Sequence, residues 1–300
     1  MTAVTGARPA RPSRTKRNLA LLGVAILVGW AVLTIDIDPG EVLELPGGLA
    51  RLFSEMFLDP GPDWSYLDDA IGFTLDDGTF RLTPSGGMIQ SLEIAWIGTV
   101  IGAILSLPLG FFAAKNVSSG LVSNVIRQVL NAIRAFPEVV LAIAIFIPIA
   151  GLGPVAGALA IGLHSVGTLG KLTAEVIEGI DPGPVEAARA TGARPLQVQR
   201  WGVLPQVLPE IIAFWLYRFE INIRAAAILG VVGAGGIGFQ LQQTLAFHRY
   251  PLAGTAVIVV VVATILVDTL SGWLRRRIIE GAEARVRGEI VEQPELAEVA

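Results

Sequence analysis

Long uncharged apolar runs alternate with short polar segments along this chain of 300 residues. A run of about 18 or more apolar residues is long enough to cross the hydrocarbon core of a bilayer as a helix. The pattern predicts six membrane-spanning helices, over residues 19–35, 88–114, 125–150, 155–177, 207–232 and 251–274. Pro108 and Pro137 are expected to kink the second and third of these helices. The sequence therefore predicts an all-α membrane protein with about six transmembrane helices.

Composition supports this interpretation. Hydrophobic residues make up 53% of the chain and charged residues only 16%, whereas soluble domains carry roughly a quarter charged residues. Cysteine is absent, and the two histidines, His164 and His248, lie far apart in the sequence. A disulfide framework, a thiolate nucleophile and a clustered histidine metal site are therefore not expected.

The distribution of basic residues predicts the orientation. With the N-terminus in the cytoplasm, sixteen Lys and Arg residues fall on the cytoplasmic side, three fall outside and three lie within spans. Such an excess is what the positive-inside rule requires of cytoplasmic loops. We expect a multi-pass protein of the plasma (inner) membrane with both termini in the cytoplasm.

Three regions follow from this pattern. Residues 1–85 comprise a basic cytoplasmic tail, the first span as a retained anchor, and an extracytoplasmic segment with eleven acidic residues between positions 36 and 85. Within that segment, residues 49–58 have helical apolar spacing and could lie along the membrane surface. Residues 86–277 form the transmembrane domain, including a cytoplasmic loop at 182–205. Residues 278–300 form a charged cytoplasmic tail, expected to be a short helix that frays.

Two glycine-containing motifs resemble nucleotide-binding sequences without their context. Residues 233–238 fit G-x-G-x-x-G, but a membrane helix precedes them and no acidic residue occurs between Glu220 and Asp268. A dinucleotide site needs a preceding strand and an acidic residue about 20 positions later. Residues 167–173 fail the phosphate-loop pattern, because Ser165 and Leu172 replace the required glycine and hydroxyl residue. We therefore expect no cofactor bound by this chain and no ATP hydrolysis by it.

The loop between the fourth and fifth spans carries the most specific signal. It contains Glu186-Ala187-Ala188, then Gly192 four residues beyond the last alanine, then Leu204-Pro205. Pro184 suits a first helical turn, Gly192 can end a helix in the left-handed conformation, and Pro195 can start the next helix. The sequence predicts two short helices joined at a glycine elbow.

This loop resembles the EAA loop of ABC importer permeases, with Gly202 standing where that family often has isoleucine. Further stretches resemble the phosphonate branch of the family, at residues 151–157, 164–172, 216–226 and 229–238. The resemblance covers roughly residues 86–275. It implies a MetI-like permease core with an extra N-terminal anchor helix.

The resemblance also implies partners. Glu186, Ala187, Ala188, Gly192, Leu204 and Pro205 would couple the permease to a separate ATPase subunit, which would bind ATP and Mg. An extracytoplasmic binding protein, a second copy of the permease and the lipid bilayer complete the expected partners; nucleic acid is not among them. A surface hairpin without any partner is the alternative interpretation of the loop.

Ionisable residues within spans are costly and usually face protein or water. Helical periodicity places Tyr217, Glu220 and Arg224 on one face of the fifth span, and Arg218 and Asn222 on another. Glu220 precedes Arg224 by four residues, which favours an ion pair within the helix.

Arg218 needs an acidic partner from another span, with Glu93, Glu138 and Glu175 as candidates. Lys171 and Glu175 are also four residues apart. These charges either line a path for an oxyanion, which an arginine fork can bind, or form a buried network that holds the spans together.

The resulting hypothesis is a transport subunit, not an enzyme, of an ATP-driven importer for phosphonate or a related phosphorus oxyanion such as phosphate or phosphite. Three alternatives remain at this stage. They are an importer of methionine or another small nutrient on the same scaffold, a membrane-embedded enzyme, and a secondary carrier that needs no ATPase.

Overall fold

The computed structural model of the chain describes residues 14–34, 39–76, 79–82 and 87–291. The basic residues Arg8 and Arg11, and the end of the predicted charged tail, lie outside the described residues. The chain divides into two compact units, Met1–Ser54 and Glu55–Ala300. The predicted three-region boundaries stay a prediction.

The first unit contains helix α1 (Arg14–Thr34), which covers most of the predicted first span and is apolar enough to cross a membrane. Helix α2 (Pro39–Phe57) begins in this unit and extends to the start of the second. It includes most of the stretch at 49–58 whose apolar spacing predicted a helix.

The second unit is built mainly of helices. Its elements, in chain order, are η1 (Trp64–Tyr66), α3 (Leu67–Ile71), β1 (Phe73–Asp76), β2 (Thr79–Leu82), α4 (Met88–Ala113), α5 (Gly120–Ala135), α6 (Glu138–Leu141), η2 (Ala142–Phe146), α7 (Ile147–Ala150), α8 (Pro154–Glu178), α9 (Pro182–Ala190), α10 (Pro195–Val198), η3 (Gln199–Val203), α11 (Leu204–Leu229), η4 (Gly230–Ala234), α12 (Gly236–Ala246) and α13 (Tyr250–Val291).

The predicted spans are recovered, two of them as bent pairs. Within the described residues, four helices can cross a membrane by length and composition: α1, α4, α8 and the part of α13 at Tyr250–Gly281. The segments Gly120–Ala135 and Glu138–Ala150 meet at 87°, and the segment Pro195–Ala234 meets α12 at 56°. Six spans result if each bent pair counts as one. The predicted kink at Pro137 is thus a near right-angled bend, because proline stands between the two helices and cannot continue the first.

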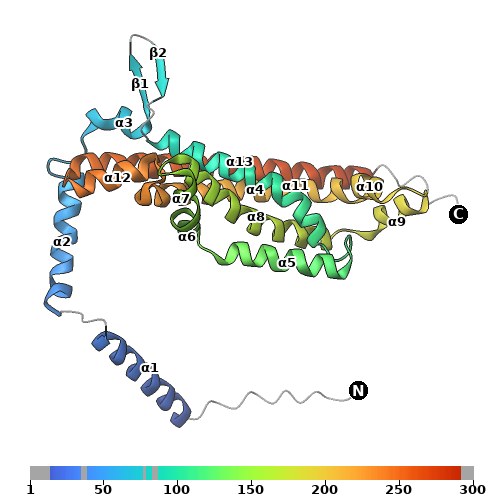
Figure 1. Ribbon diagram of the computed structural model, residues 1–300, viewed down its shortest axis with the longest axis horizontal. Helices are drawn as coiled ribbons and strands as arrows, with labels where there is room; N and C mark the ends of the chain where they lie inside the picture. The colour runs from blue at the N-terminus through green and yellow to red at the C-terminus, as the bar shows by residue number, and fades with distance from the viewer. Residues whose placement is uncertain (1–13, 35–38, 77–78, 83–86, 292–300) are drawn as a thin grey trace. The chain divides into compact units, whose positions relative to one another are not determined.

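Helices α4, α8, α11 and α13 run alongside one another, with α5 beside α8 (Figure 1). Small residues allow α4 and α8 to approach closely: a Cβ added at Gly98 would lie 2.7 Å from Ile161 Cγ2, and one added at Gly102 would meet Ser165. Helices in membranes commonly associate through such small residues. The short helices α9 and α10 lie at one end of this bundle, and α12 lies at the other (Figure 1).

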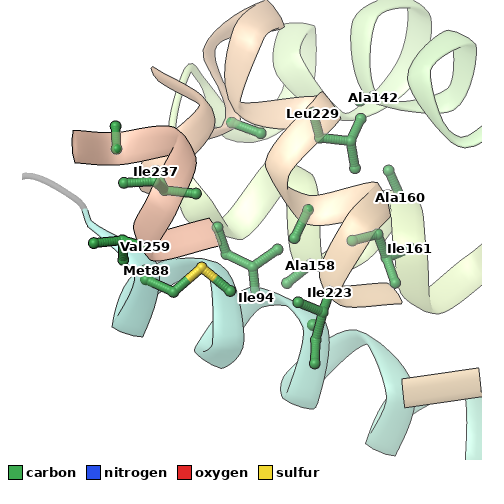
Figure 2. Packing of buried hydrophobic residues seen from close by; sticks show 14 of the residues in the cluster. Met88, Ile94, Ala142, Ala158, Ala160, Ile161, Ile223, Leu229, Ile237 and Val259 are labelled. Atoms are coloured by element: carbon green, nitrogen blue, oxygen red, sulfur yellow. The ribbon is translucent and has the colours of Figure 1, made fainter. Parts of the chain in front are cut away.

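A hydrophobic core joins these helices near the α12 end. It contains the buried side chains of Ile94 from α4, Ile161 from α8 and Ile223 from α11, together with Leu229 and Ile237 (Figure 2). A second core near the α9 end contains Leu130, Val166 and Ile211, with Val185 of α9 packed against it. The loop at residues 182–205 therefore rests on the transmembrane helices.

Two features differ from the predicted pattern. An antiparallel hairpin pairs Phe73 of β1 with Leu82 of β2. The alternation of apolar and polar residues along both strands is the sequence pattern that could have predicted it. Helix α13 continues past Arg277 to Val291, so the first part of the predicted tail extends the last span and does not form a separate short helix.

The turn at residues 233–238 packs against α4. The backbone N–H of Gly236 donates to Gln90 Oε1 (2.6 Å), and the N–H of Ile237 donates to Ser91 Oγ (3.0 Å). These are N-terminal amides of α12, the groups that a nucleotide phosphate would need. Side chains of α4 occupy them, which agrees with a tightly packed turn.

Candidate functional site

Two groups of residues stand out: the loop at residues 182–205, and a polar cluster between α4, α6, α8 and α11. In the loop, α9 begins at Pro182, two residues before the predicted start. Asp181 explains the difference, because its carboxylate accepts a hydrogen bond from the N–H of Gly183 (2.9 Å) and so caps the helix. Proline then occupies the first helical position, where its missing N–H costs nothing.

The predicted elbow is confirmed. Gly192 has φ +76°, a left-handed conformation that glycine adopts without a Cβ penalty. Helix α10 follows at Pro195, and the N–H of Arg194 donates to Gln197 Oε1 (2.8 Å) at its start. The first helix of the predicted pair, α9, is short, whereas α10 continues through η3 into α11 as one segment, Pro195–Ala234. The two helices meet at the end of the bundle (Figure 1).

Gly202, the departure from the family pattern, lies where the hairpin folds back. It is buried, and a Cβ added there would lie 3.2 Å from Val185 Cα and 3.3 Å from Pro184 O. Glycine at position 202 therefore lets α9 pack directly on η3.

The residues predicted to couple to an ATPase differ in exposure. Glu186, Ala187, Gly192 and Pro205 are exposed, whereas Ala188 and Leu204 are half-buried. Sequence analysis missed two large exposed apolar side chains beside them, Leu196 (78% exposed) and Trp201 (69% exposed). The hairpin therefore presents both a charge and apolar surface to its surroundings.

Glu178, at the end of α8 just before the loop, ties α8 to two other helices. Its Oε1 accepts from Arg127 Nη2 of α5 (2.6 Å) and from the backbone N–H of Lys115, just after α4 (2.7 Å). Arg127 Nε also donates to Ala113 O (2.8 Å). The end of α8 that leads into the loop is therefore fixed to α5 and to the end of α4.

The polar cluster contains Arg218, and Glu138 is the partner that the structure selects from the three candidate acids. Arg218 Nη2 lies 3.1 Å from Glu138 Oε1, and Arg218 Nε donates to Ser165 Oγ (3.0 Å). Asn222, on the same face of α11, donates through Nδ2 to Ser165 Oγ (3.1 Å) and Thr99 Oγ1 (2.8 Å). Arg218 and Asn222 are both buried.

His164 belongs to this cluster, although sequence analysis gave it no role. Its Nδ1 lies 2.8 Å from Glu138 Oε1 and 3.3 Å from Arg218 Nη2. The sequence gives one indication of this role: His164 lies seven residues before Lys171, which places both on the same face of α8.

Tyr217, Glu220 and Arg224 share another face of α11, as the helical periodicity predicted, and this face lies toward α13. Arg275 lies 5.6 Å from the ring of Tyr217 and pairs with Glu220 (3.5 Å). Arg224 Nη1 pairs with Asp268 Oδ2 (3.1 Å).

The expected ion pair between Glu220 and Arg224 is thus not among the pairs that the described residues form. Each finds its partner on α13 because that helix packs along the face that both occupy. The pair Lys171–Glu175 does form, with 3.8 Å between the charged atoms.

Comparison with known proteins identifies the family to which this architecture belongs. The family described as "Binding-protein-dependent transport system inner membrane component" matches residues 106–280. The phosphite transport system permease protein PtxC of Stutzerimonas stutzeri is 45% identical over 190 residues, which are 63% of this chain and 69% of that protein. The phosphate-import permease protein PhnE of Mycolicibacterium smegmatis is 40% identical over 276 residues, covering 90% of this chain and 49% of that relative.

A solved structure shares the fold. An inward-facing conformation of the MetNI methionine ABC transporter superposes with a TM-score of 0.57 at 20% sequence identity, covering 64% of this chain and 94% of the other. The predicted permease fold is therefore confirmed. This chain belongs to the family of inner-membrane components of binding-protein-dependent transport systems.

Proposed function

We propose that this chain is the transmembrane permease subunit of an ATP-driven importer that moves a phosphorus oxyanion, such as phosphonate, phosphite or phosphate, inward across the plasma membrane. The observation that carries the proposal is the exposed hairpin of α9 and α10, held on the transmembrane helices by the packing of Val185 and by hydrogen bonds between Asp181 and Gln206. A rigid, exposed lever at one end of a helical bundle is suited to receive motion from a separate motor.

In this proposal, an ATP-binding cassette subunit grips the hairpin around Glu186 and Gly192. ATP and Mg bind to that partner. The permease works as a homodimer, and an extracytoplasmic binding protein delivers the substrate. Both termini of the permease lie in the cytoplasm, so the hairpin lies on the side where ATP is available.

The substrate class rests on two supports. The relatives with 45% and 40% identity are named for phosphite and phosphate transport. Arg218 provides a buried guanidinium inside the bundle, and the planar fork of arginine binds oxyanions well. The likeness to the methionine transporter at 20% identity concerns the fold alone.

Reconstitution tests the proposal. The permease, together with its ATPase and its binding protein, is placed in liposomes that contain ATP. We expect uptake of labelled phosphite, methylphosphonate or phosphate that requires both partners. The control is a complex whose ATPase subunit cannot hydrolyse ATP, which should take up no substrate.

Two results would contradict the proposal. Uptake of methionine with no phosphorus oxyanion would assign a different substrate class. Uptake by the permease without the ATPase would identify a secondary carrier.

A further inference from the structure

We propose that Arg218 and His164 form an oxyanion-binding site within the membrane, and that the carboxylate of Glu138 occupies this site until the transported oxyanion displaces it. The inference rests on the proposed function, because it assigns to that function a specific binding position.

The geometry around Glu138 is that of a bound anion. One oxygen, Oε1, lies 3.1 Å from Arg218 Nη2 and 2.8 Å from His164 Nδ1. A guanidinium and an imidazole N–H converging on one oxygen atom would recognise an oxygen of a phosphonate, phosphite or phosphate equally well. The carboxylate thus stands where a substrate oxygen would be held.

The cationic side of the site is fixed by long helices. Arg218 Nε donates to Ser165 Oγ, and Asn222 Nδ2 donates to the same oxygen and to Thr99 Oγ1. These residues come from α4, α8 and α11, which form the closely packed centre of the bundle (Figure 1). Arg218 is therefore held in position whether or not Glu138 is present.

The carboxylate of Glu138 lies on a different segment of the chain. Glu138 is the first residue of the helical segment Glu138–Ala150, which follows the 87° bend at Pro137 and contains the π-helical turn η2. A π-helical turn within a helix often marks a functional position. A segment that joins α5 through a sharp bend can shift without moving the long helices that hold Arg218.

The site is open along one face of α8, on the side toward which an imported anion would leave. The side chains of Glu138 and His164 are 21% and 16% exposed, whereas that of Arg218 is 7% exposed. His164, Thr168, Lys171 and Glu175 recur every three or four residues and so share one face of α8. Polar residues along one face of a span commonly border protein or a water-filled path, and this face leads from His164 to the α9 end of the bundle.

The charges couple release of Glu138 to substrate arrival. A buried guanidinium that loses its counter-ion is strongly unfavourable, so Glu138 should not leave Arg218 without a replacement. A phosphorus oxyanion supplies that replacement. The exchange therefore keeps the path closed in the absence of substrate.

Anion binding to the purified complex tests the exchange. The probes are phosphite and methylphosphonate, with chloride at equal ionic strength as the control salt. Since Glu138→Gln removes the competing carboxylate, we expect phosphite to bind about tenfold more tightly than to the wild type, the size expected for one charge-assisted hydrogen bond. Arg218→Gln should abolish the binding. Glu93→Gln, which neutralises an exposed carboxylate on α4, is the matched control and should bind like the wild type.

Thermal unfolding gives a second readout. Glu138→Gln should lower the Tm, and phosphite should restore it, because the added anion takes the place of the missing carboxylate. If Glu138→Gln does not fold, Glu138→Asp, with its shorter reach to Arg218, should show the same rescue to a smaller extent.

Uptake by the wild-type complex separates the two proposals. If the wild type imports a phosphorus oxyanion but the Glu138 variant shows neither tighter binding nor rescue by phosphite, the exchange is wrong and the proposed function stands. If the wild type imports no phosphorus oxyanion, the proposed function fails, and this site fails with it.

Discussion

Gln206 and Asp181, 25 residues apart, hold each other by two hydrogen bonds: the N–H of Asp181 donates to Gln206 Oε1 (3.1 Å), and Gln206 Nε2 donates to the carbonyl of Asp181 (3.2 Å). The same Nε2 donates to Gly202 O (2.6 Å). The side chain thus closes the base of the hairpin, joining the residue that caps α9 to the first turn of α11.

Replacing Gln206 with leucine should loosen this closure while keeping the size of the side chain. Each lost hydrogen bond is worth about 1 kcal/mol, and the loss should loosen the attachment of α9 to α11. We expect ATP hydrolysis to continue with less substrate imported for each ATP. Hydrogen exchange at the backbone amides of Asp181 and Gly183 should rise. Gln242→Leu, at an exposed position of α12, is the control, and equal behaviour of the two variants would refute the role of Gln206.

Gly202→Ile introduces the residue that the family often has at this position, yet here it should destabilise the hairpin. An added Cβ would lie 3.2 Å from Val185 Cα, and overpacking of this kind costs about 1–3 kcal/mol. Thermal unfolding of the complex measures the effect. Gly202→Ala should be milder, and an isoleucine variant as stable as the wild type would show that α9 is not held by this approach.

Gly192→Pro should uncouple uptake from ATP hydrolysis without preventing membrane insertion. Proline fixes φ at about −65°, whereas Gly192 has φ +76°. The elbow between α9 and α10 therefore cannot form in the proline variant. Gly192→Asn is the matched control, because asparagine tolerates the left-handed conformation. The prediction fails if the proline and asparagine variants import substrate at the same rate.

Glu186→Arg should weaken attachment of the ATPase, because it reverses an exposed charge on the predicted docking surface. Co-purification of the ATPase and the rate of uptake measure this. Glu280→Arg reverses an exposed charge on α13 and should leave both unchanged. Normal attachment and uptake in Glu186→Arg would argue strongly against docking at this helix.

Loss of one partner should reduce the stability of the protein more at a buried ion pair than at a half-exposed one. Arg218→Gln leaves Glu138 without its guanidinium, and breaking a buried pair costs about 3–5 kcal/mol. The double variant Arg218→Gln/Glu138→Gln should recover much of that loss. Arg224→Gln breaks a half-exposed pair with Asp268 and should cost no more than about 1 kcal/mol. Equal losses for the two single variants, measured by thermal unfolding, would contradict this ranking.

The apolar pattern alone was sufficient for the spans, because a helix must satisfy its own backbone hydrogen bonds in a bilayer and needs a minimum length to cross it. Local chemistry was also sufficient for the hairpin: Gly192 marked the elbow and Pro195 the start of α10. The same periodicity assigned Arg218 and Tyr217 to different faces of α11. Each of these predictions depends on residues within a few positions of one another.

The tertiary structure decided which distant groups meet. It selected Glu138, 80 residues away, as the partner of Arg218, brought His164 to the same oxygen, and directed Arg224 to Asp268 instead of Glu220. It also gave Gly202 its role, through the close approach of α9. Helical periodicity fixes the direction in which a side chain leaves its own helix, but only the packing of several helices determines which side chain lies opposite.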